Sequence, residues 1–141
     1  MDSIRELSHT ADIGFEVEAP TLERLFELSA EGLVAALGLE ARAGRDRAAQ
    51  PETETIRLEK GDRERLLVAW LRELLWRCTS RHVVPEGTDV RMTDEATLEA
   101  RVSWRPWPES GPVREIKGVT YHGLEVARRR EGWHARVVFD V

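Results

Sequence analysis

Cysteine is almost absent from this chain, since Cys78 is the single one in 141 residues. A disulfide within the chain and a zinc site of several thiolates are therefore excluded. No apolar run of about eighteen residues occurs, and the pattern of a secretory leader is missing. The sequence accordingly predicts a cytoplasmic protein with no membrane among its partners.

An excess of positive charge is also lacking. The formal net charge is -5 and the sequence pI is about 5.5, which predicts no strong direct binding of nucleic acid. Phosphate-binding glycine loops, dinucleotide fingerprints and a Ser/His/Asp arrangement do not appear either. We therefore expect the protein not to be an enzyme in its own right.

Lysine is scarce, because 19 of the 21 basic residues are arginine. Arginine can replace lysine where charge alone matters, but not where a compact ammonium group is needed. The two lysines, Lys60 and Lys117, are therefore candidates for a specific role.

The length predicts one domain covering residues 1–141, with roughly two-thirds of the unfolded chain's surface buried on folding. Alternating apolar residues predict a strand from Ile13. A helix is expected from its N-cap, Thr21, to Gly38, which ends it. The segment Leu39–Glu52 lacks periodicity and is predicted to be a surface loop.

A second helix is predicted from Gly61 and Asp62 to about Thr79, after a strand near residues 53–60. Its apolar residues cover more than half of its circumference, which is typical of a helix buried on most sides. The simplest arrangement places the helices between two sheets, or between a sheet and a partner protein.

The remainder of the chain is rich in predicted β-structure. A turn at Pro85–Gly87 leads to a short strand around Val90, and an alternating strand follows from Leu98 to Trp104. Residues 115–128 and 133–141 are expected to form a hairpin. The predicted fold class is therefore α+β, a single domain with two main helices packed with or between antiparallel β-sheets.

The end of the chain brings two carboxylates together, the side chain of Asp140 and the α-carboxylate of Val141. Hard oxygen donors suit Ca²⁺, Mg²⁺ or Mn²⁺. A third donor is needed, and His9 and Asp12, just before the first strand, are the best candidates. Close carboxylates repel each other, so a site containing Asp12 and Asp140 should bind a cation or titrate abnormally. A solvated strand end, with an Asx-type turn before the first strand, explains the same residues without a metal.

Lys117 and His122 lie on the strand that begins the hairpin. Simple alternation places Lys117 and Tyr121 on one face of this strand and Thr120 and His122 on the other. Lys117 is suited to contact a phosphate or to pair with the acidic residues, and His122 to support a metal ligand. A purely structural role fits each of them as well.

Three of the five tryptophans have an open assignment. Trp76, Trp104 and Trp107 are either exposed at a protein interface or part of an ordinary core.

Four ordered segments resemble the archease family, and together they extend over nearly the whole chain. They are His9–Asp12, Leu67–Leu75, Glu115–Glu125 and Val138–Val141. Gly118 stands where the family often has Ala, and Val141 where Ile is frequent. Neither difference removes an oxygen donor.

The resemblance implies an archease-like fold and an accessory function. Archeases assist RtcB-type RNA ligases in tRNA splicing and RNA repair by promoting GTP-dependent guanylylation of the ligase and multiple turnover. The family's metal-binding residues correspond to Asp12, Asp140 and Val141, and its functional lysine corresponds to Lys117. The implied cofactor is a divalent cation, with Ca²⁺ as the bound ion and Mg²⁺ or Mn²⁺ in action. The implied partner is the ligase, at its GTP and metal site.

Two other functions fit the same residues. One is a small metal-dependent phosphoester hydrolase that uses His9, Asp12, His122 and Asp140. The other is a general chaperone-like partner in RNA processing that acts through exposed aromatic side chains.

Overall fold

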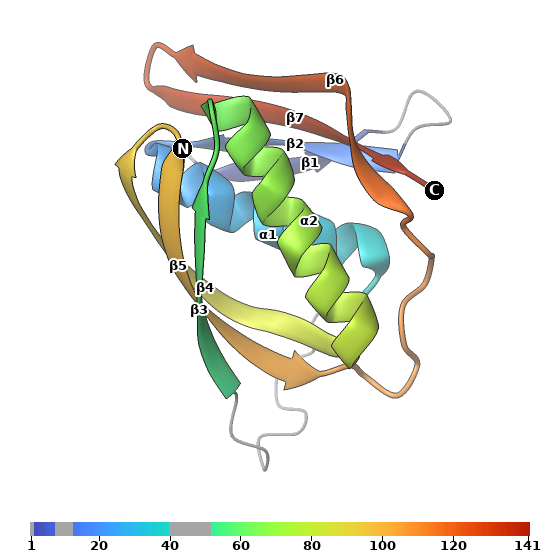
Figure 1. Cartoon of the computed structure of the whole chain (residues 1–141). Coiled ribbons are helices and arrows are strands. Elements are labelled where there is room, and N and C mark those ends of the chain that lie inside the picture. The colour runs from blue at the N-terminus through green and yellow to red at the C-terminus, as the bar shows by residue number, and fades with distance from the viewer. Residues whose placement is uncertain (1, 8–12, 40–51) are drawn as a thin grey trace.

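The computed structural model describes residues 2–7, 13–39 and 52–141 (Figure 1). Within these residues the chain forms seven strands and two helices. In chain order they are β1 (Ser3–Glu6), β2 (Ile13–Ala19), α1 (Leu22–Leu37), β3 (Glu52–Glu59), α2 (Arg63–Arg81), β4 (Val83–Asp94), β5 (Thr97–Pro106), β6 (Gly118–Arg129) and β7 (Gly132–Asp140).

Both helices lie between two antiparallel sheets (Figure 1). One sheet has the strand order β1-β2-β7-β6 and the other β3-β5-β4. Helix α1 packs against β2 of the first sheet and β4 of the second, while α2 packs against β6 of the first and β3 and β4 of the second. The α+β fold class with helices between antiparallel sheets is thus confirmed.

Helix α1 begins and ends where its capping residues predict. The Thr21 hydroxyl accepts a hydrogen bond from the Arg24 amide at 3.1 Å, which satisfies a free donor of the first turn. Gly38 has a φ of 74°, a conformation that side chains disfavour, and its amide donates to the Ala35 carbonyl at 3.0 Å.

Helix α2 is buried on most of its circumference, as its composition predicts. Eight of its residues are buried, and the Trp70 indole donates to the Phe26 carbonyl on α1 at 2.9 Å. One strip of α2 remains open to solvent, and it carries Trp76, whose exposed fraction is 59%. Trp76 is therefore not a core residue of the isolated chain.

The other two undecided tryptophans belong to the interior. Trp104 on β5 is buried. Trp107 is half-buried, its ring stacks on His82 with 4.2 Å between centroids, and its indole donates to the Val83 carbonyl at 3.1 Å.

Two expectations about strands were wrong, and one strand was missed. β4 is continuous from Val83, because a shift in register at Pro85/Gly87 replaces the expected turn. β1 was not expected at all, because its four residues are exposed and show no alternation. The hairpin's first strand starts at Gly118 rather than at residue 115. The loop predicted at 39–52 falls mainly on residues 40–51, which lie outside the described residues.

A wide irregularity interrupts the pairing of β6 with β7. Thr120 pairs with Val138, and the next pair is Glu125 with Arg136, so the residues 121–124 face only Val137. Extra residues in one strand break the two-residue period, so regular alternation does not extend from Thr120 to Glu125. Tyr121, His122 and Gly123 are exposed, and the Tyr121 ring lies beside Arg72 of α2.

Candidate functional site

The end of β7 lies between the beginnings of β2 and β6. Ile13, the first residue of β2, pairs with Phe139. Gly118, the first residue of β6, pairs with Asp140. Two chain segments more than a hundred residues apart are thus held at the same end of one sheet, as Figure 1 shows for the C-terminus and the start of β6.

Lys117 and Asp140 are joined directly through their main chains. The Lys117 amide donates to the Asp140 carbonyl at 2.7 Å. Farther along β6, the Arg72 guanidinium of α2 donates to the Val119 carbonyl at 3.0 Å. The segment that carries Lys117 is therefore fixed to β7 on one side and to α2 on the other.

We define the tip as Lys117, Asp140 and Val141. All three are exposed, and the Val141 exposed fraction is 51%. Neither Asp140 nor Val141 forms an ion pair with another residue in the described ranges 2–7, 13–39 and 52–141. Their oxygens are consequently accessible to a ligand from solvent.

His9 and Asp12, the other proposed donors, lie outside the described residues. Asp12 is bonded to Ile13, which pairs with Phe139, the residue before Asp140. Among the residues that are described, no group of three or more His, Cys, Asp or Glu side chains is arranged to hold a metal ion.

His122 lies in the irregular part of β6. It is exposed, and its amide donates to the Thr120 hydroxyl at 3.0 Å. Its position in this segment separates it from the regular pairing that holds Lys117 beside Asp140.

A second polar cluster lies on the outer face of the same sheet, around His134 of β7. The buried imidazole has Glu125 at 2.8 Å from Nδ1 and Glu16 at 3.3 Å from Nε2. Burial alone would raise the pKa of Glu16. The hydrogen bonds and charges of Arg5 and His134 have a larger combined effect, so the pKa of Glu16 lies below its ordinary value. These carboxylates already have partners, in contrast to Asp140.

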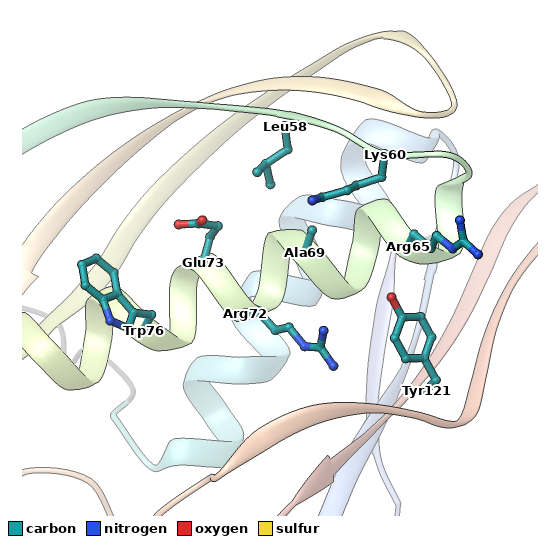
Figure 2. Close-up of a pocket in the computed structure, with 8 residues that line it drawn as sticks. All are labelled: Leu58, Lys60, Arg65, Ala69, Arg72, Glu73, Trp76 and Tyr121. Carbon is teal, nitrogen blue, oxygen red and sulfur yellow. The ribbon is translucent and has the colours of Figure 1, made fainter.

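A groove of about 660 Å³, which the sequence did not predict, runs along the open strip of α2 (Figure 2). Its floor includes Arg65, Arg72 and Trp76 of α2, with Lys60 on one side and Tyr121 on the other. The spacing of Arg65, Arg72 and Trp76 places them on the same side of α2, which the sequence alone indicates. The positions of Lys60 and Tyr121 beside that face depend on tertiary packing.

No helix in the described part of the chain is long and apolar enough to cross a membrane. The fold and the tip define a small α+β protein in which two helices are enclosed by antiparallel sheets and the C-terminal strand ends beside two other strand starts. The chain belongs to the archease family, because the model of the archease protein family (MTH1598/TM1083) matches residues 5–141.

Relatives over the full length support this membership. Protein archease of Methanosarcina mazei is 36% identical over 142 residues, covering 96% of this chain and 93% of the relative. Protein archease of Thermococcus gammatolerans is 32% identical and covers 94% of each.

Two solved structures share the fold. The solution structure of Methanobacterium thermoautotrophicum protein 1598 is 25% identical with a TM-score of 0.67, over 98% of each chain. The crystal structure of an archease from Thermotoga maritima, described as a possible chaperone, is 21% identical with a TM-score of 0.63, over 97% of this chain and 96% of that one. The second similarity is evidence of fold alone.

Proposed function

We propose that this protein is a non-catalytic activator of an RtcB-type RNA ligase in tRNA splicing and RNA repair. It promotes guanylylation of the ligase by GTP and multiple turnover by presenting a metal-binding acidic tip to the nucleotide site of the ligase. The observation that carries the proposal is the pairing that brings the start of β2 and the segment of Lys117 to the end of β7.

The oxygen donors at the tip fit a divalent cation. Asp140 and Val141 supply exposed carboxylates without a cationic partner in the described part of the chain, and Asp12, which lies outside the described residues, is the proposed third donor. Carboxylates this close in the chain repel one another unless a cation lies between them. Ca²⁺, Mg²⁺ and Mn²⁺ all prefer such hard oxygen ligands.

The cation supplies concentrated positive charge that stabilises charge developing on phosphate oxygens. Asp12, Asp140 and Val141 would hold such a cation, and Asp140 and Val141 are exposed at the end of β7, where it could enter a partner's site. Lys117, whose main-chain amide bonds to Asp140, carries an ammonium group that is suited to a phosphate. His9 and His122 are proposed to face the partner rather than to act in a reaction.

Guanylylation of an RtcB-type ligase with GTP and Mn²⁺ tests the proposal, with and without this protein. We expect Asp140→Asn to reduce the stimulation by at least about tenfold, in the range seen when groups that support a metal site are removed. Asp89→Asn, which removes an exposed carboxylate on β4 of the other sheet, is the matched control and should stimulate like the wild type.

Equal stimulation by Asp140→Asn would contradict the metal-bearing tip. The non-catalytic role is tested on the isolated protein with a panel of phosphoesters and Mn²⁺. Turnover there that depends on Asp140 would favour the hydrolase over the activator.

A further inference from the structure

The groove along α2 is lined by positively charged side chains, although the protein is negatively charged overall. Lys60 follows β3, while Arg65 and Arg72 project from α2. The net charge of the chain is -5. Three like charges around one hollow repel one another, so a bound anion would stabilise the groove.

Most of the hydrogen-bond donors in this groove remain available. Arg72 has five N–H donors, and its side-chain hydrogen bond within the described residues goes to the Val119 carbonyl. Neither Lys60 nor Arg72 has a carboxylate within 4.0 Å among the described residues, and the nearest acid to Arg65 is Asp62 at 3.9 Å. The acid in the groove, Glu73, is bound to Arg77.

Two exposed aromatic rings lie in the same groove. Trp76 is 59% exposed and Tyr121 50% exposed. The Arg72 guanidinium lies over the Tyr121 ring, 5.5 Å from its centroid, which supports Arg72 in its position. Trp76 lies at the other end of the strip, with its indole directed away from the three cations in Figure 2.

The groove therefore has Lys60, Arg65 and Arg72 toward one end and the Trp76 ring at the other, where Arg77 and Arg81 each lie 5.9 Å from its centroid. Arg65 and Trp76 are eleven residues apart on α2, which corresponds to about 16 Å along the helix axis. A volume of about 660 Å³ lies within the size range of small-molecule sites. A ligand with several negative charges at one end and a planar ring at the other matches these dimensions.

We propose that this groove binds a nucleoside di- or triphosphate. The phosphates lie among Lys60, Arg65 and Arg72, and the base stacks on Trp76. A compact polyphosphate neutralises three cations at once and matches the fork of an arginine, whereas each carboxylate of an acidic peptide supplies one charge. A long polynucleotide is disfavoured because its remaining phosphates would be repelled by a protein whose net charge is -5.

The test is a titration of the full chain in EDTA, followed by backbone and indole N–H resonances. EDTA removes any contribution of a metal at the tip. The probes are GTP, UTP, guanosine, inorganic tripolyphosphate and a glutamate-rich peptide containing one tryptophan. We expect saturable binding of GTP and UTP, with the Trp76 indole among the shifted resonances.

Substitutions separate the two ends of the groove. Arg72→Gln and Lys60→Gln should each weaken GTP binding about tenfold or more, because a charged hydrogen-bond donor is lost. Trp76→Leu should weaken it at least about fivefold through loss of stacking. Arg91→Gln, an exposed arginine on β4, should bind like the wild type, and all variants should keep the circular dichroism spectrum.

Three outcomes would overturn the proposal. The first is the absence of saturable binding by either nucleotide. The second is equal affinity for tripolyphosphate and GTP together with no effect of Trp76→Leu, which would mean a general anion site. The third is binding of the acidic peptide but not of nucleotides, which would make the groove a protein-docking surface.

Discussion

Asp140 and His134 lie on the same face of β7, but one is exposed and the other is buried. His134 is buried, and carboxylates contact both of its ring nitrogens. Asp140 is exposed, and its carboxylate has no ion-pair partner in the described part of the chain. Buried polar groups are normally satisfied, so the His134 cluster has a structural role, whereas Asp140 is available to a ligand.

Cys78 offers a test of burial at a single residue. Burial raises the pKa of its thiol to about 12, from an ordinary value of 9.0. Iodoacetamide reacts with the thiolate, so we expect no alkylation of the folded protein at pH 8 and full alkylation in concentrated urea, measured by mass spectrometry. Alkylation at the same rate in both states would contradict this placement of the thiol.

The direction of the pH effect follows from the same shift. The pKa of Cys78 is higher in the folded than in the unfolded state, so its contribution to stability is complete below about pH 9. That contribution is lost as the pH rises from 9 toward 12, because the unfolded chain releases its proton first.

At the level of elements, contact between α1 and β2 depends on Gly32. A Cβ atom at this position would lie 2.7 Å from the buried Phe15 ring. We expect Gly32→Ala to lower the free energy of unfolding by about 1–3 kcal/mol, although Ala favours a helix interior over Gly by up to about 1 kcal/mol. Urea unfolding followed by circular dichroism measures the change.

Gly87→Ala is the matched control. A Cβ atom at Gly87 would meet nothing within 4 Å, so its effect on stability should be small. An increase in stability with Gly32→Ala would show that α1 and β2 are packed less closely than described.

Elements with strong local signals were predictable from the sequence. Capping residues and periodicity predicted α1 and α2, and alternation predicted β5. β1 has no such signal, because it is a short exposed strand at the sheet edge that pairs only with β2. The irregularity in β6 could not be predicted, because it depends on how this strand pairs with β7.

At the scale of the whole molecule, the candidate sites combine residues that are far apart in the sequence. Asp140 and Val141 could be selected from the sequence because two carboxylates are adjacent there. The main-chain hydrogen bond from Lys117 to Asp140 could be recognised only once the pairing of the strands was known. The groove beside α2 could not be predicted, since Lys60 and Tyr121 reach it from separate sheets.

Binding of Mn²⁺ to the isolated protein tests the central claim most directly. The measurement is paramagnetic broadening of the Lys117 and Gly118 amide resonances in the wild type, in Asp140→Asn and in a chain extended by one glycine after Val141. We predict saturable broadening in the wild type and in the Asp89→Asn control, and at least about tenfold weaker binding in the other two proteins. Equal Mn²⁺ affinity in Asp140→Asn and the wild type would contradict a metal site at the tip.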